Sequence, residues 1–253
     1  MDLKSKIKKT IINLFARIKK SDDSRCIFYH DIHSDNKFTH MSTSVDLFIK
    51  HINIIQDLGF EIVHEITKEK KQIAISFDDG FKGVYENIEV INRLKIPVTI
   101  FVVSSFLGRD NFLNNNNLQE IAKNEFIDIQ SHSHSHVELS NLDSNTLHEE
   151  LQKSKEILES ICKNKINSIC FPKGMFNRLV IKKALELGYE KQFSSLPGSY
   201  YANIFAPSSQ DNCFLSVRRR SLVQFSEENE FRSILNGGDT ILYNWYYKKH
   251  FVR

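Results

Sequence analysis

Short apolar runs recur along this chain, and longer segments with helical spacing separate them. Runs of strand length lie at residues 26–29, 72–77, 98–103, 126–130 and 166–171, with weaker candidates at 192–194 and 215–223. The segments between them carry apolar residues three or four positions apart, which is typical of helices that bury one face. Strands that alternate with helices predict a parallel sheet in an α/β fold.

Capping residues help to set the expected helix bounds. Helices are predicted over residues 45–58, 81–94, 146–162, 178–187 and 227–235. Ser42 or Ser44 can cap the first of these helices, and Asn177 can cap the fourth. The asparagine-rich segment 111–117 is predicted to be an exposed loop, and the segment 203–212 is also loop-like.

The residues that suggest chemistry all lie just after predicted strands. They are His30, Asp78, Asp79, His132, His136 and Lys173. In a barrel of alternating strands and helices, the carboxyl ends of the strands share one rim, where catalytic groups collect. The pattern therefore predicts that residues far apart in the chain meet at one site.

Composition fits one globular domain and argues against a nucleic-acid partner. The chain has 253 residues, of which 41% are hydrophobic and 26% charged, an ordinary balance for a protein with a sizeable core. Its net charge of +3 is too small to indicate nucleic-acid binding. The four cysteines show no CxxC spacing, so buried free thiols in a reducing compartment are expected.

Positive charge is concentrated at the start of the chain. Residues 1–20 carry seven Lys or Arg against one Asp. An apolar stripe runs through them at helical spacing, formed by Ile7, Ile11, Leu14, Phe15 and Ile18. This pattern predicts a basic amphipathic helix over residues 1–20, ahead of a catalytic domain over 25–253. The helix either packs against that domain or lies on an anionic membrane surface.

Residues 1–20 also give an expectation for the cellular location of the protein. Arg17 interrupts the apolar run and no small-residue cleavage site follows, so a secretory signal is not expected. No stretch approaches the roughly 18 apolar residues of a membrane span. A cytoplasmic location is therefore expected, with a peripheral position at the inner membrane face through residues 1–20.

Two polar clusters carry the chemistry. Residues 76–80 read Ser-Phe-Asp-Asp-Gly, and residues 132–136 read His-Ser-His-Ser-His. The first alone could be a common turn, and the second alone a solvated loop. Together they offer two imidazoles and a carboxylate for a divalent metal, most readily Zn²⁺, and a second carboxylate as a base. His132 and His136 are four apart and would share one side of a helical turn, whereas His134 would point elsewhere.

These residues resemble the motifs of the polysaccharide deacetylases, the family with the chitooligosaccharide deacetylase homology domain. Residues 76–80 resemble its first motif, and residues 132–139 match its second, His-Ser/Thr-x-x-His-x-x-Leu. Residues 171–174, Phe-Pro-Lys-Gly, look like a variant of its third. The pair Tyr29-His30 is similar to the opening of the subgroup that deacetylates biofilm poly-N-acetylglucosamine. The resemblance covers about residues 25–220 and implies a single-domain, distorted (β/α)7-type barrel.

The resemblance also implies a role for each residue. Asp78 would be the general base that activates water, while Asp79, His132 and His136 would hold the metal ion. The backbone N–H of Lys173 would help to stabilise the oxyanion. His30 would be the general acid that protonates the departing amine. No other cofactor is implied.

This chain departs from the family pattern at two positions of the third motif. The usual arginine two residues before the motif's proline is Cys170 here, and the usual tyrosine is Lys173. That arginine normally pairs with the base aspartate, so another group must orient Asp78. The run Arg218-Arg219-Arg220 offers three candidates.

Three functions are compatible with these residues. The first is a metal-dependent hydrolase that removes N-acetyl groups from an N-acetylated sugar or glycan. The second is a degenerate member of the family that binds glycan without cleaving it, as the altered third motif allows. The third is a C–N hydrolase that acts on a small cyclic amide.

Overall fold

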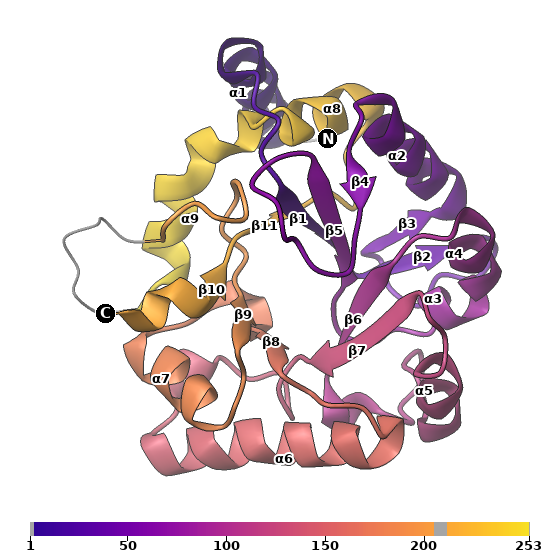
Figure 1. Cartoon of the computed structure of the whole chain (residues 1–253), viewed down its shortest axis with the longest axis vertical. Coiled ribbons are helices and arrows are strands. Elements are labelled where there is room, and N and C mark those ends of the chain that lie inside the picture. The colour runs from indigo at the N-terminus through magenta and orange to yellow at the C-terminus, as the bar shows by residue number, and fades with distance from the viewer. Residues whose placement is uncertain (1–2, 205–211, 253) are drawn as a thin grey trace.

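The computed structural model describes residues 3–204 and 212–252 and has an α/β fold built on a parallel sheet (Figure 1). Within these residues the sheet has nine strands: β1 (Arg25–Tyr29), β4 (Glu61–Ile62), β5 (Gln72–Phe77), β6 (Val98–Val102), β7 (Ile127–Ser131), β8 (Ser168–Cys170), β9 (Lys191–Phe193), β10 (Val217–Arg218) and β11 (Arg220–Leu222). Two short parallel strands, β2 (Asp31–His33) and β3 (Ser42–Ser44), form a separate pair.

The sheet forms a distorted, open barrel. Its strands follow the order β10-β9-β8-β7-β6-β5-β1-β11, with β4 beside β5, and every pair is parallel. The two ends of this path, β10 and β11, are consecutive segments separated only by Arg219. Within the described residues no strand pair closes the ring. The predicted α/β fold and distorted barrel are thus confirmed, with the ring left open.

Helices surround this sheet (Figure 1). They are α1 (Leu3–Lys19), α2 (Val45–Asp57), α3 (Gly83–Glu86), α4 (Ile88–Leu94), α5 (Asn115–Ile121), α6 (Ser144–Cys162), α7 (Arg178–Glu186), α8 (Glu228–Leu235) and α9 (Tyr243–His250). Short 3₁₀ turns are η1 (Ser104–Phe106), η2 (Leu139–Asn141), η3 (Pro172–Gly174), η4 (Asn212–Ser216) and η5 (Gly238–Leu242). In the described part of the chain, no helix is both long and apolar enough to span a membrane.

The caps explain why several helices begin where the sequence predicts. The Ser44 hydroxyl accepts the Leu47 N–H at the start of α2, and the Asn177 side chain accepts the Val180 N–H at the start of α7. Each cap satisfies one of the backbone donors that a helix leaves free at its first turn. Strand β1 is buried along its whole length, as a parallel strand covered on both faces should be.

Two element predictions are wrong. The segment 111–117 is not all loop, because Asn114 and Asn117 form a reciprocal capping box that starts α5. The predicted helix 81–94 is broken into α3 and α4 at Asn87, whose backbone leaves the helical region. The Asn87 side chain donates to the Gly83 carbonyl and so competes with the helical backbone. Most of the expected loop 203–212 lies outside the described residues.

The buried His51 links three elements of the core. Its Nε2 donates to the Ser226 carbonyl at 2.7 Å, and its Nδ1 accepts from the Tyr29 hydroxyl at 2.8 Å. The ring also stacks on Phe231 of α8, with centroids 3.9 Å apart. Both nitrogens of the neutral ring are therefore satisfied, and burial lowers the pKa of His51 to about 4.

This histidine should make the fold sensitive to acid. Its folded-state pKa lies below the ordinary value of about 6.5, so its contribution to stability is complete above that pH. The contribution is lost as the pH falls toward 4, because the unfolded chain then binds a proton that the fold excludes. Between pH 7 and pH 4.5 we expect wild type to lose about 2 kcal/mol more unfolding free energy than His51→Gln. Urea unfolding of both proteins at the two pH values tests this, and equal losses would contradict it.

Candidate active site

The six predicted site residues meet at the carboxyl edge of the sheet. They line one cavity of about 420 Å³ and are His30, Asp78, Asp79, His132, His136 and Lys173. They follow β1, β5, β7 and β8, which are neighbours in the sheet apart from the intervening β6. A cavity of this size at this edge is a common setting for ligand binding.

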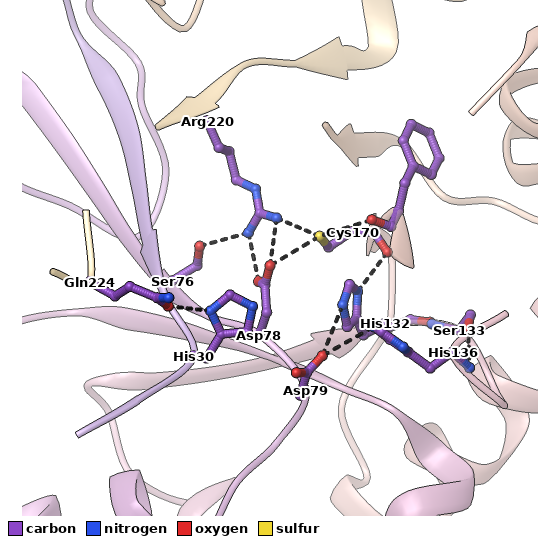
Figure 2. Close-up of polar contacts among 12 residues, drawn as sticks. His30, Ser76, Asp78, Asp79, His132, Ser133, His136, Cys170, Arg220 and Gln224 are labelled. Atoms are coloured by element: carbon purple, nitrogen blue, oxygen red, sulfur yellow. Dashed lines mark hydrogen bonds and ion pairs between the residues drawn. The ribbon is translucent and has the colours of Figure 1, made fainter. Parts of the chain in front are cut away.

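Asp79 faces both predicted imidazole ligands (Figure 2). Its Oδ1 lies 3.3 Å from the Nε2 atom of His132 and 3.3 Å from the Nε2 atom of His136. Asp79 and His132 are buried, and His136 is half-buried. These three ligand atoms lie within 4.8 Å of one another, so they converge on a single point.

The two imidazoles converge for a different reason from the one predicted. Residues 132–136 are not helical, and both Ser133 (φ 66°) and His136 (φ 62°) have left-handed backbones. The Ser133 N–H donates to the Ser131 hydroxyl, and the His136 N–H donates to the Ser133 hydroxyl. A tight turn held by serine side chains, not a helical turn, brings His132 and His136 together.

Unlike the predicted ligands His132 and His136, His134 faces away from Asp79. Its Nδ1 atom is 2.8 Å from the hydroxyl of Ser104 in η1, and its backbone carbonyl accepts the Ser105 N–H. The ring thus binds the neighbouring segment of the rim, while His132 and His136 face Asp79.

The arrangement around Asp79 fits a divalent metal ion. Among the described residues, the buried Asp79 Oδ1 has no hydrogen-bond partner. His132 donates its Nδ1 proton to the Cys170 carbonyl at 2.9 Å, which leaves Nε2 as the ring nitrogen directed at Asp79. Metal-binding histidines usually donate the proton of their other ring nitrogen to a backbone carbonyl or a carboxylate in this way.

The charges around Asp79 also suit a cation. Burial opposes ionisation of this carboxyl, but His132 and His136 outweigh it and hold the pKa of Asp79 well below its ordinary value. Burial likewise opposes protonation of His132, but the hydrogen bond to the Cys170 carbonyl and the charges of Asp79 and Asp78 raise the pKa of His132 above its ordinary range. A divalent ion would compete with that proton for Nε2.

Asp78 is held by Arg220 instead of by an arginine at position 170. The guanidinium forms a bidentate salt bridge, with Nη1–Oδ1 at 2.7 Å and Nη2–Oδ2 at 2.8 Å. Both side chains are buried, and Nη1 also donates to the Ser76 hydroxyl at 3.0 Å. Cys170 lies beside the pair, with its Sγ 3.6 Å from Asp78 Oδ2 (Figure 2). Of the three arginines that the sequence offered, Arg220 is the one that orients Asp78.

This salt bridge sets the charge state of the pair. Burial alone would raise the pKa of Asp78, but the charge and hydrogen bonds of Arg220 lower it. Burial also opposes the charge on Arg220, and Asp78 outweighs that effect and raises the pKa of Arg220. Burial raises the pKa of the Cys170 thiol, so this side chain stays neutral next to the pair.

His30 lies on the opposite side of Asp78 from Cys170 (Figure 2). Its Nδ1 atom is 2.5 Å from Oε1 of Gln224, a residue just beyond β11. An amide oxygen can only accept, so Nδ1 carries a proton and Nε2 is the nitrogen free to exchange one. Gln224 is itself fixed, because the Thr43 hydroxyl donates to its backbone carbonyl at 2.5 Å.

The third motif forms another part of the cavity wall. Lys173 has a left-handed backbone (φ 56°) within η3, and its Nζ lies 3.3 Å from Glu138 Oε1. A Cβ atom on the next residue, Gly174, would lie 2.9 Å from the Ser195 side chain and 3.1 Å from His250 Nδ1. Only glycine fits here without a shift of these neighbours.

Some residues of the site were not predicted. Gln224 and the α9 residues Tyr246, Lys249 and His250 all lie in or against the cavity wall. No spacing or motif marks Gln224. The sequence shows that residues 245–253 are aromatic and basic. It does not show where this segment lies in the fold, because that depends on contacts with distant segments.

Fold and site together define an α/β-barrel protein with an enzyme-like cavity at the carboxyl edge of its sheet. The family described as polysaccharide deacetylase matches residues 65–191, just over half of the chain. The chain therefore belongs to the polysaccharide deacetylase family.

Similar proteins agree with this assignment. A Staphylococcus aureus (strain MSSA476) protein named poly-beta-1,6-N-acetyl-D-glucosamine N-deacetylase is 31% identical in an alignment 156 residues long, which covers 52% of this chain and 53% of that protein. The chain matches between about half and two thirds of the length of its curated relatives. The expected likeness to the poly-N-acetylglucosamine deacetylase subgroup is confirmed.

Solved structures share the fold. A polysaccharide deacetylase from Bacillus cereus superposes with a TM-score of 0.71 at 21% identity and covers 84% of this chain and 69% of that one. IcaB from Ammonifex degensii gives a TM-score of 0.71 at 16% identity, with 86% of this chain and 99% of that one covered. At these identities the likeness concerns the fold alone.

Proposed function

We propose that this protein is a metal-dependent hydrolase that removes N-acetyl groups from an N-acetylated glycan. The observation that carries the proposal is that the two adjacent carboxylates have different partners. Asp79 faces two imidazoles, whereas Asp78 is turned toward a guanidinium. One carboxylate is thus arranged to bind a cation and the other to stay ionised beside it.

Asp79, His132 and His136 would hold the ion, and two imidazoles with one carboxylate suit Zn²⁺. When bound, the ion supplies a Lewis acid that polarises the acetamide carbonyl and acidifies water. The cavity beside these residues leaves room for substrate.

Asp78 would act as the general base. Its carboxylate takes a proton from the water whose oxygen forms the new bond to the acetyl carbon. Arg220 occupies both carboxylate oxygens from the side of β11, which keeps Asp78 ionised and limits its rotation. Lys173 would contribute its backbone N–H to the oxyanion that develops on the carbonyl oxygen.

His30 would act as the general acid. It would give the proton on Nε2 to the sugar nitrogen as the C–N bond breaks, so that acetate and an amine are released. The hydrogen bond from Nδ1 to Gln224 holds the ring in one orientation for this transfer. The acid and the base would then lie on the same cavity wall, side by side.

The substrate proposed is a β-linked N-acetylglucosamine chain. The similarity to the Staphylococcus aureus deacetylase supports this class. The altered third motif, at Cys170 and Lys173, favours the degenerate, non-catalytic alternative. Arg220 supplies the guanidinium that position 170 lacks, which weakens the part of this argument that concerns Cys170.

The test is acetate release from β-1,6-linked N-acetylglucosamine oligomers, with a small cyclic amide as the comparison substrate. We expect release from the oligomers, loss of release with a zinc chelator, and recovery when Zn²⁺ is added back. Release that continues after the ion has been removed would contradict the metal dependence. Binding of oligomers without turnover would favour the degenerate alternative, and turnover of the cyclic amide alone would favour the third function.

A further inference from the structure

Helix α1 packs on the body of the protein through a face other than its apolar stripe. Ile12 and Ala16 are buried against α8 and η5. The contact is close, because a Cβ atom on Gly238 would lie 2.3 Å from the Ile12 carbonyl. Lys9 adds a 3.0 Å salt bridge to Glu230 of α8. The helix is therefore a fixed part of the domain.

Most of the stripe predicted from the sequence remains uncovered, although Phe15 is half-buried. Four aliphatic side chains at helical spacing are exposed: Ile7 (51%), Ile11 (40%), Leu14 (60%) and Ile18 (76%). At about 100° per residue, they share one face, turned away from Ile12 and Ala16. Figure 1 places α1 at the edge of the molecule, outside α8. An uncovered apolar face of this kind is typical of an interaction surface.

Basic residues border this stripe on both sides. The same helical periodicity puts Lys6 and Arg17 along one edge and Lys8 and Lys19 along the other. All four are exposed, and α1 contains no acidic residue. An apolar face between two basic edges fits a helix that lies in the plane of an anionic bilayer, with its aliphatic side chains below the headgroups.

We propose that α1 docks the protein on anionic membranes, with Ile7, Ile11, Leu14 and Ile18 inserted and Lys6, Arg17 and Lys19 on lipid phosphates. The neighbouring α9 presents the exposed Trp245, and tryptophan favours membrane interfaces. The two helices touch, since Lys8 Nζ donates to the Tyr246 hydroxyl at 3.0 Å. Lys8 and Tyr246 also line the catalytic cavity, so docking brings the mouth of that cavity to the lipid surface.

Vesicle sedimentation of the full chain tests this proposal without any glycan, so its outcome is independent of the proposed enzyme activity. Wild type should bind phosphatidylglycerol-rich vesicles at least tenfold more tightly than pure phosphatidylcholine vesicles, and salt should weaken the binding. The double variants Leu14→Ser with Ile18→Ser, and Lys6→Gln with Arg17→Gln, should each weaken binding to the anionic vesicles at least tenfold.

Matched variants control for general changes in surface character. Leu179→Ser with Leu185→Ser removes two exposed leucines from α7, and Lys123→Gln with Lys163→Gln removes two exposed lysines. Both should bind within twofold of wild type, and all variants should unfold at the same temperature. Stripe variants that bind as wild type does would overturn the proposal. The proposal would also be overturned if wild type did not bind vesicles but formed a dimer that the stripe variants disrupt. The stripe would then be the interface with a second copy of the chain.

Discussion

Asp78→Asn is expected to lower acetate release by on the order of a thousandfold while the protein still binds zinc. The amide oxygen can still accept a hydrogen bond from Arg220, but the side chain can no longer take a proton from water. Asp79→Asn should lose both properties, because it removes the carboxylate proposed as a ligand from the point where His132 and His136 converge. Its zinc affinity should fall at least about a hundredfold. Acetate assays and zinc titrations of the two proteins measure this separation.

His134→Ala is the matched control for these variants. It removes an imidazole from the same turn as His132 and His136, but its ring contacts Ser104 and not Asp79. We expect near wild-type zinc binding and turnover within about tenfold of wild type. If Asp78→Asn lost zinc as completely as Asp79→Asn, the two carboxylates would share one role and the assignment of a separate base would be wrong.

Arg220→Ala is expected to affect both stability and activity. It leaves Asp78 ionised, buried and without its partner. Breaking a buried ion pair in this way should lower the free energy of unfolding by about 3–5 kcal/mol. Turnover should fall by about a hundredfold, because Asp78, the proposed base, is no longer oriented. Arg220→Lys should recover only part of this, since an ammonium cannot form the bidentate contact with both oxygens. Urea unfolding and acetate release report the two effects separately.

Cys170→Arg should rescue the Arg220→Ala protein. Cys170 Sγ lies 3.6 Å from Asp78 Oδ2, so a guanidinium introduced there can enter the space that Arg220 vacates and pair with the same carboxylate. We expect the double variant to regain at least half of the lost unfolding free energy and about tenfold in turnover. Cys170→Ser, which keeps Arg220, should stay within about tenfold of wild-type turnover. A double variant as impaired as Arg220→Ala would show that position 170 cannot replace position 220.

The order of the elements and the polar residues at the strand ends were predictable, because both follow from local patterns. Hydrophobic periodicity and caps such as Ser44 and Asn177 depend on neighbouring residues only. The errors at 111–117 and Asn87 arise where an asparagine can serve either a turn or a helix end, a choice that the tertiary context makes.

From the sequence alone, the partner of Asp78 could be limited to three arginines, and the partner of His30 could not be predicted. Arg220 and Asp78 are 142 positions apart, and His30 and Gln224 are 194 apart. The sequence does not indicate which of the three consecutive arginines pairs with Asp78. Arg219 separates β10 from β11, and the register in which β11 pairs with its neighbour cannot be read from the sequence. Only the pairing of β11 with β1 brings Arg220 over Asp78.

The position of Arg220 has a consequence for how relatives of this chain are judged. In this chain the guanidinium that pairs with Asp78 comes from β11, on the far side of β1, whereas the family pattern places an arginine at position 170. A second arginine would place two buried cations against a single carboxylate, which is costly. Across related chains, arginine at these two positions should therefore be mutually exclusive. A search that demands arginine in the third motif would discard as inactive those enzymes that carry it on β11.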